Sequence, residues 1–312
     1  MMRRTSWWHW LATVCMAGLL SACGSGSDDK DPTVVEIAQG DPQFSLLAEA
    51  VVAADLAGTL SGAGPFTVFA PTNDAFASLL TELGVTKQQL LADKTLLRAV
   101  LQYHVLGAQV PKVSVPVGKA ITPLQGGIFK IDSTTGGLVV TDGRNRQARI
   151  LATDVMASNG VVHVIDKVLL PANKTLVATA QSLPDFSILV EAVVAAGLVD
   201  TLNGNGPFTV FAPTNAAFAK LLAELGVSKE QLLADKALLT QVLTYHVLPG
   251  RVLKADVPVG SAIVTVQGQT FTVDSTLTIT DGRGRKARIT GTDVLASNGV
   301  VHVLDTVILP KP

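Results

Sequence analysis

The sequence predicts an α+β fold that occurs twice in tandem, and three observations lead to this prediction. Long stretches of the chain repeat at a fixed offset. Within each repeat, apolar residues first recur at helical spacing, and later they form short segments typical of strands. The chain has 312 residues, of which 48% are hydrophobic and 16% charged, so it has enough apolar material for two buried cores rather than long disorder.

The repeat is clearest in residues 66–73, because Phe-Thr-Val-Phe-Ala-Pro-Thr-Asn returns unchanged 142 residues later. The Tyr-His pair at 103–104 returns after the same interval, whereas residues 157–164 return after 139. Three residues are therefore missing from the second copy, and we place the gap near 133–140. A period this long indicates two globular domains rather than a solenoid.

Helices are expected in the first half of each copy. In the first copy, apolar residues follow helical spacing over 44–56, and residues 66–70 predict a short strand. Three further helices each begin after an N-capping residue. They are expected from Thr72 to the terminating Gly84, from Thr86 to 91, and from Asp93 to about 103.

Short β segments are expected in the second half of each copy, and in the first copy they lie at 119–123, 128–131, 138–141, 148–154 and 161–170. Ser158-Asn159-Gly160 predicts a hairpin, because Asn-Gly accepts the positive φ of a type I′ turn.

The N-terminus predicts an export signal. A basic start at Arg3 and Arg4 and an apolar stretch precede Leu-Ser-Ala-Cys at 20–23, which resembles the lipobox of bacterial lipoproteins. That resemblance implies cleavage before Cys23 and lipidation of Cys23. Because Gly24 follows, it also implies the outer membrane, with the periplasmic or surface face left open. The location expected is thus exported and lipid-anchored in the bacterial cell envelope.

Four parts of the chain follow from these patterns. We expect a signal peptide at 1–22, a flexible Gly/Ser/Asp tether at 23–32, one domain at 33–171 and a second at 172–312.

The 24 Lys and Arg nearly balance the 25 Asp and Glu, so no global charge favours nucleic acid. No cysteine follows Cys23, which excludes a disulfide or a cysteine metal site in the body.

The two copies resemble the fasciclin-domain family. The resemblance rests on residues 66–76, on the Tyr-His pairs and on Ser-Asn-Gly-Val-Val-His-Val at 158–164, and it covers 33–171 and 175–310. It implies a β-wedge with helices packed against the sheets, and a role in adhesion or matrix contact without catalysis or cofactor. In animal members the Tyr-His region is tied to integrin binding. One departure is Ala216, which stands where the first copy has Asp74.

The resemblance makes the Tyr-His pairs our candidates for partner contact: Tyr103, His104, Tyr245 and His246. Packing of the tyrosine at a helix end is the other interpretation of each pair. His104, His163, His246 and His302 are expected to be half-buried and hydrogen-bonded. Two separated histidines per domain do not form a metal site, so no metal is predicted.

Basic loops supply a second kind of candidate. We expect contacts with carboxylate, sulfate or phosphate groups from Arg144, Arg146, Arg149, Arg283, Arg285, Lys286 and Arg288. The other interpretation is a solvated hairpin tip that resists edge pairing.

The function predicted is a lipid-anchored adhesion or contact module, not an enzyme. Its partner is an unidentified protein or extracellular polymer, acidic if the basic loops bind it, and it meets the membrane through the lipid alone. One alternative is a hydrolase that uses Ser158 and His163 with Asp154, which lie close in sequence but lack a nucleophile-elbow pattern. Another is a structural envelope protein without an external ligand.

Overall fold

Local capping and apolar periodicity build the helical half of domain 1 largely as expected. The computed structural model describes residues 31–312, so the predicted signal peptide, Cys23 and most of the tether lie outside the described residues. Thr72, Thr86 and Asp93 each cap a helix, and Gly84 ends one at φ 65°. The helices are α1 (Val34–Gly40), α2 (Ser45–Ala53), α3 (Ala57–Leu60), α4 (Asn73–Leu83), α5 (Lys87–Ala92) and α6 (Lys94–Tyr103), with short 3-10 turns η1 (Pro42–Phe44) and η2 (Lys112–Ser114).

Seven strands form the sheet of domain 1 in the order β2-β1-β7-β6-β5-β4-β3. They are β1 (Phe66–Pro71), β2 (Val105–Leu106), β3 (Ala120–Ile121), β4 (Phe129–Thr134), β5 (Gly137–Thr141), β6 (Gln147–Ala157) and β7 (Gly160–Ile165). β1 and β7 are parallel, and the other neighbours are antiparallel.

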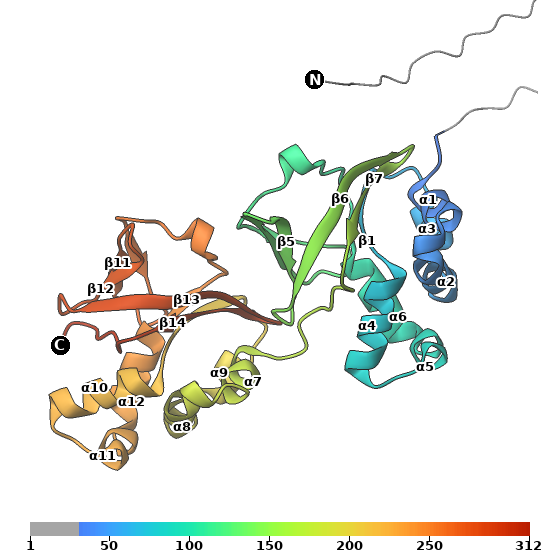
Figure 1. Ribbon diagram of the computed structural model, residues 1–312. Helices are drawn as coiled ribbons and strands as arrows, with labels where there is room; N and C mark the ends of the chain where they lie inside the picture. Colours follow the sequence, from blue (N-terminus) through green and yellow to red (C-terminus); the bar gives the residue numbers. More distant parts are fainter. Residues whose placement is uncertain (1–30) are drawn as a thin grey trace, which may run out of the picture. The chain divides into compact units, whose positions relative to one another are not determined.

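Strand β6 bends the sheet. Its first residues, 147–149, pair with β5, whereas the strand from Ile150 onward pairs with β7 through two register shifts. Asp154 lies at the second shift with φ 59°, a left-handed conformation that Asp tolerates better than most residues. The bend separates a helix-covered part of the sheet from a smaller β part (Figure 1).

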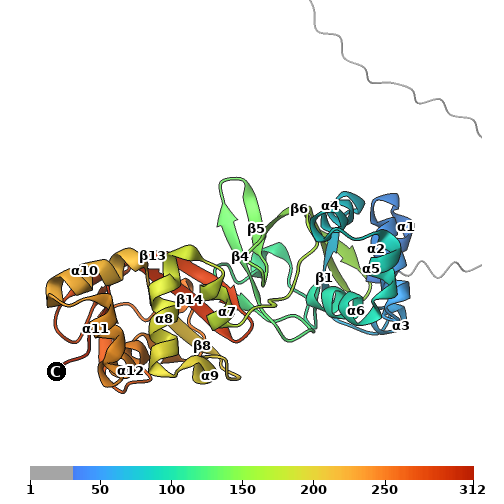
Figure 2. The same ribbon diagram turned by 90° about the horizontal axis from the view of Figure 1, so that it is seen from below.

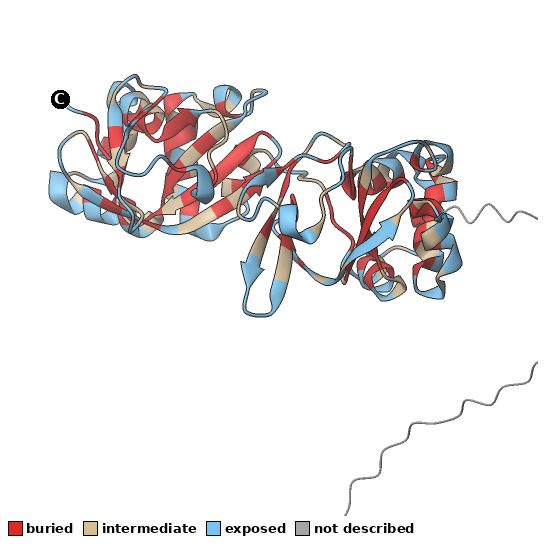
Figure 3. Cartoon of the chain, turned by 90° about the horizontal axis from the view of Figure 1, so that it is seen from above, coloured by how far each residue is buried: buried red, intermediate tan, exposed pale blue. Residues whose placement is uncertain are grey.

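Each domain therefore has two apolar cores, one on either side of the long central strands. In domain 1, Phe44, Phe76 and Leu97 belong to the core under the helices, while Tyr103 and Phe129 belong to the core of the β part. Red buried segments run through both parts of the domain (Figure 3). The α+β prediction is confirmed, since each copy combines a mainly helical first half with a largely antiparallel sheet whose strands, apart from the first, follow the helices.

Domain 2 repeats this order. Its helices are α7 (Leu176–Gln181), α8 (Ser187–Ala196), α9 (Val199–Leu202), α10 (Asn215–Leu225), α11 (Lys229–Ala234) and α12 (Lys236–Tyr245), with η3 (Pro184–Phe186) and η4 (Lys254–Asp256). Its strands are β8 (Phe208–Pro213), β9 (Val247–Pro249), β10 (Ala262–Val264), β11 (Thr270–Val273), β12 (Thr278–Thr280), β13 (Lys286–Ala296) and β14 (Gly299–Leu304). The helices again cover one side of the β8–β14 region (Figure 2).

The hairpin at residues 158–160 forms, but its turn differs from the prediction. Ala157 pairs with Gly160, so the two loop residues are Ser158 and Asn159, and neither has the positive φ of a type I′ turn. The glycine serves close approach instead, because a Cβ at Gly160 would lie 2.2 Å from the carbonyl oxygen of Phe66. The type I′ prediction is therefore wrong, because Asn159 and Gly160 make contacts with distant parts of the domain instead of forming that turn.

Asn159 connects the hairpin to the start of the domain. Its Oδ1 accepts from the Val34 N–H at 3.0 Å, and its Nδ2 donates to the carbonyls of Leu60 and Gly62, both at 2.8 Å. Asn298 makes the matching bonds in domain 2. Residues 32–312 form one compact unit, and no helix in 31–312 is both long and apolar enough to cross a bilayer.

Candidate functional site

The Tyr-His pairs lie at the C-terminal ends of α6 and α12, where both side chains point into the protein. Tyr103 and Tyr245 are fully buried and contact Phe129 and Phe271 edge-on, with ring centroids 5.8 and 6.0 Å apart. The Tyr103 hydroxyl donates to the carbonyl of Ile128. Burial raises the pKa of Tyr103 far above its ordinary value, and it raises the pKa of Tyr245 to about 12.

His104 joins its own helix to the segment after β7. Its Nδ1 donates to the carbonyl of Val100 at 2.7 Å, and its Nε2 accepts from the Leu169 N–H at 2.8 Å. This pair of bonds requires the neutral ring with the proton on Nδ1. Burial lowers the pKa of His104 from 6.5 to about 4, although the bond to Val100 opposes the shift.

His246 makes the equivalent bonds in domain 2, to the carbonyl of Val242 at 2.7 Å and from the Ile308 N–H at 3.1 Å. Burial lowers the pKa of His246 to about 4 as well. At most 2% of either histidine side chain or of its tyrosine neighbour is exposed. The prediction of direct partner contact through Tyr103, His104, Tyr245 and His246 is therefore corrected, because these side chains do not reach the surface of the folded domains.

His163 uses the opposite tautomer and is equally committed to backbone groups. Its Nδ1 accepts from the Asp154 N–H at 3.3 Å, and its Nε2 donates to the carbonyl of Val110 at 2.9 Å. Only 1% of His163 is exposed. Since both ring nitrogens are occupied, the ring is not available to activate the Ser158 hydroxyl, and the hydrolase alternative has no support from this geometry.

His302 repeats the His163 arrangement, with bonds from the Asp293 N–H and to the carbonyl of Val252. Burial lowers the pKa of His302. All four histidines of the described chain are more deeply buried than the half-buried state that we expected. Within residues 31–312, no three His, Cys, Asp or Glu side chains gather in an arrangement that would bind a metal ion.

The basic loop of domain 1 is partly neutralised by its own acids. Arg146 forms ion pairs with Asp142 at 2.8 Å and with Glu82 at 2.6 Å. Asp142 is 1% exposed and also accepts the N–H groups of Arg144, Arg146 and Leu170. Arg146 is thus a structural side chain that supports the loop, rather than one presented to an anion.

The remaining cations of the two loops divide by exposure. Arg285 pairs with Glu224 at 2.7 Å, and Arg144 is half-buried. Exposed cations without an acidic partner among the described residues are Arg149, Arg283, Lys286 and Arg288. Of the seven cations predicted to contact anions, these four are the ones that an anion in solution can reach.

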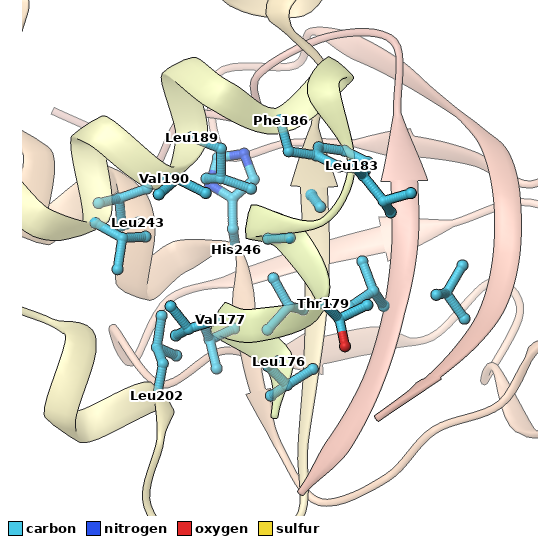
Figure 4. Close-up of a pocket in the computed structure, with 17 residues that line it drawn as sticks. Leu176, Val177, Thr179, Leu183, Phe186, Leu189, Val190, Leu202, Leu243 and His246 are labelled. Atoms are coloured by element: carbon cyan, nitrogen blue, oxygen red, sulfur yellow. The ribbon is translucent and has the colours of Figure 1, made fainter. Parts of the chain in front are cut away.

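An apolar cavity of about 50 Å³ lies between α7, α8 and the sheet of domain 2, with His246 in its wall (Figure 4). Leu176, Phe186, Leu189 and Leu243 point into it (Figure 4). Domain 1 has a matching cavity of about 30 Å³. An apolar cavity of about 150 Å³ takes one benzene-sized ligand, so both cavities are packing defects rather than ligand sites in this conformation.

Sequence reasoning missed the two buried polar residues that organise each domain, Asp142 with its twin Asp281 and Asn159 with its twin Asn298. Their bonds reach residues 28 to 125 positions away, so no local pattern shows them. Their presence in both copies was the available signal, but the repeat also preserves many residues without such a role.

Comparison with known proteins agrees with this architecture. The fasciclin domain model matches residues 42–171 and again 184–310. Transforming growth factor-beta-induced protein ig-h3 of Sus scrofa is 33% identical over 253 residues, which are 80% of this chain and 35% of that protein. The chain therefore spans about a third of the length of this relative.

Bacterial relatives match over a single domain. Protein sll1483 of Synechocystis sp. is 43% identical over 150 residues, 47% of this chain and 79% of that protein. Among solved structures, a FAS1 domain pair from the insect cell adhesion molecule fasciclin I covers 88% of this chain and 95% of its own, with 19% identity and a TM-score of 0.42. The two family matches together span most of the sequence, and the chain belongs to the fasciclin-domain family through two tandem copies of the domain.

Proposed function

We propose that the protein is a non-enzymatic adhesion or contact module, exported and held on the bacterial cell envelope by lipid on Cys23. The observation that carries the non-enzymatic part is the commitment of all four histidines of residues 31–312 to backbone hydrogen bonds inside the core. A general base must reach a substrate proton, and these rings have no free nitrogen to do so. Membership of the fasciclin family supports the contact role.

The exposed cations of the two loops supply the contact chemistry that we assign to the module. Arg149, Arg283, Lys286 and Arg288 are exposed and have no acidic partner in the described region. A guanidinium binds carboxylate or sulfate groups in a bidentate manner, so an acidic extracellular polymer fits them. Surface cations of this kind act in a salt-dependent way.

Attachment of cells and tethering of the protein are tested together. A strain that lacks the protein should attach less well to surfaces, and the wild-type gene should restore attachment. A Cys23→Ser variant should be secreted or periplasmic but not membrane-bound, and it should not restore attachment. If deletion leaves attachment unchanged under every condition tested, the adhesion role is wrong; if the Cys23→Ser form stays in the membrane fraction, the lipid anchor is wrong.

The acidic polymer is tested with the soluble chain that begins after Cys23 and with dextran sulfate or polygalacturonate as the probe. A Lys286→Ala/Arg288→Ala variant should bind the probe about tenfold more weakly. The matched control is Lys87→Ala/Lys94→Ala, which removes two cations from the surface of the helical side, where they form ion pairs that contribute little. Equal losses in both variants, or no binding by the wild type, would exclude a loop-specific anion site.

Cleavage of the signal has an optical test. All three tryptophans precede Cys23, whereas both tyrosines follow it. Protein purified from membranes should therefore absorb only weakly at 280 nm. A tryptophan signal in that material would show that residues before Cys23 remain attached.

A further inference from the structure

The two fasciclin domains meet through a loop and a strand of domain 1 that contact one face of domain 2. The amide side chain of Asn145 donates to the carbonyl of Leu295 at 3.0 Å and accepts from the Leu295 N–H at 2.7 Å. Ile128 of domain 1 packs with Leu253, Leu295 and Val300 of domain 2. Asn145 thus covers the edge of β13 opposite β14, along a stretch that β12 does not reach.

A buried ion pair lies beside this contact. Lys130 Nζ is 2.9 Å from Asp293 Oδ2 and 3.0 Å from Asp132 Oδ2, and the Lys130 and Asp293 side chains are 13% and 2% exposed. Burial acts to lower the pKa of Lys130, but the hydrogen bonds to Asp293 and Asp132 outweigh it, so the pKa is raised and the ammonium stays charged. We call Lys130 and Asn145 the donor pair, and Leu253, Asp293 and Leu295 the receiving face.

The internal repeat shows that domain 1 has a receiving face of its own. Asp154 corresponds to Asp293 and has the same left-handed conformation, with φ 59° against 60°. Met156 corresponds to Leu295, and each pairs with the matching valine of the last strand, Val161 or Val300. Asp154 and Asp293 each accept the backbone N–H of the first residue of the matching 3-10 turn, Lys112 of η2 or Lys254 of η4.

Nothing in the described part of the chain covers the receiving face of domain 1. Met156 is 59% exposed, against 1% for Leu295. Val113 is 92% exposed and follows Lys112, whose N–H bonds to Asp154. The Asn145 side chain hydrogen-bonds to the backbone of Leu295 in domain 2. No side chain of residues 31–312 makes such a bond to the backbone of Met156, the residue equivalent to Leu295. An open strand edge with an acid and two exposed apolar side chains needs a partner or protection.

Domain 2 of a second copy does not supply that partner. Where domain 1 has Lys130 and Asn145, domain 2 has Thr272 and Gly284, which offer neither an ammonium group nor a side-chain amide. The donor pair of domain 1 is already bound to its own domain 2. The loss of both donor groups therefore prevents the head-to-tail contact from propagating into an open filament.

We propose that the receiving face of domain 1, formed by Pro111, Asp154 and Met156 as the twins of Leu253, Asp293 and Leu295, is a docking surface for another fasciclin-type domain that carries a lysine and an asparagine at the donor positions. The exposed Val113 on η2 adds apolar surface near this face. The partner class follows from the occupant of the equivalent face of domain 2, in which an amide bridges the strand edge and an ammonium meets the acid. The proposal names a partner class for the contact role proposed above and rests on that role for its biological purpose. Its test is separate, because it measures the association of purified chains.

The test gives domain 2 the missing donor pair. A Thr272→Lys/Gly284→Asn variant of the soluble chain after Cys23 should associate head to tail, and its mass in analytical ultracentrifugation should at least double as concentration rises. The wild type should remain monomeric. Asparagine suits position 284, because Gly284 has φ 76° and no atom within 4 Å of an added Cβ. If the double variant does not fold, the Gly284→Asn variant is tested alone, and its mass should rise with concentration in the same way.

Two matched substitutions locate the association. Adding Met156→Glu should return the variant to a monomer, whereas Val52→Glu, at a similarly exposed valine on α2, should leave association intact. Asp154→Asn keeps an acceptor for the Lys112 N–H and should weaken association without unfolding. A folded donor variant that stays monomeric, or one whose association ignores Met156→Glu, overturns the proposal; failure of cell attachment alone leaves it standing.

Discussion

Lowering the pH from 7.5 to 5.0 should destabilise both domains through His104 and His246. Each ring accepts an N–H at Nε2, and protonation of Nε2 would place two donors face to face. Their pKa values fall from 6.5 in the unfolded chain to about 4 in the folded protein, chiefly through burial. The unfolded chain therefore binds protons first as the pH falls below 6.5, and the free energy of unfolding decreases until about pH 4.

The magnitude follows from these two pKa values. At pH 5.0 the unfolded histidine is almost fully protonated and the folded one is almost fully neutral, which lowers stability by about 2 kcal/mol per histidine. The loss from His104 and His246 is about 2 kcal/mol for each domain if the domains unfold separately, and about 4 kcal/mol if they unfold together. Burial also lowers the pKa of His302, which adds to the loss in domain 2. Few carboxylates titrate above pH 5, so the histidines dominate this window.

The measurement is urea unfolding followed by far-ultraviolet circular dichroism at pH 7.5 and 5.0. The control is His104→Gln/His246→Gln, which is less stable at both pH values but should lose most of the difference between them. The reasoning is refuted if the wild type is equally stable or more stable at pH 5.0. It is also refuted if the double variant retains the full difference.

Three further outcomes are expected from single substitutions, each measured by thermal or urea unfolding. Asp142→Asn should cost about 2 to 4 kcal/mol, because it removes the buried acid that pairs with Arg146 and accepts the Leu170 N–H, and it leaves Arg146 with the exposed Glu82; Asp281→Asn should cost less, since no guanidinium pairs with Asp281, and equal losses would contradict this account. Gly160→Ala should cost several kcal/mol, on the order of an overpacked core site, whereas Gly40→Ala, with open space around its Cβ, should be nearly neutral. Lys130→Met should loosen the contact between the domains and raise the radius of gyration in X-ray scattering; an unchanged profile would show that the ion pair does not hold the contact.

Local signals were sufficient for much of the helical half. Thr72, Thr86 and Asp93 cap helices within three residues of themselves, so their effect can be seen in a short window. Helix α1 was not predicted, although Thr33 and Glu36 form a local capping box at its start. The helix has only seven residues, and part of what holds it is a bond from Val34 to Asn159, 125 residues away. The β segments from β3 onward were located and the short β2 was missed, while the pairing of the strands and the bend at β6 depend on register that composition does not specify.

The candidate site was less predictable than the fold. A tyrosine and a histidine at a helix end can face solvent or the core, and the choice is made by partners far along the chain. His104 bonds to Leu169, which follows the last strand of the domain. Arg146 was grouped with the exposed cations, yet its acid partners include Glu82 on α4. Contacts between the domains, such as Asn145 with Leu295, join residues 150 positions apart and leave no local trace.

The entry of the chain into each domain has a mechanical consequence. The carbonyl of Pro32 accepts the Ser158 N–H, and the Val34 N–H is held by Asn159, so the first ordered residues are bound to the β6–β7 hairpin. Lys174 and Leu176 are bound in the same way to the hairpin of domain 2. A pulling force applied ahead of Pro32 would therefore load the central strands in shear instead of unzipping the first helix. Each domain is built to bear tension at the point where the chain enters it.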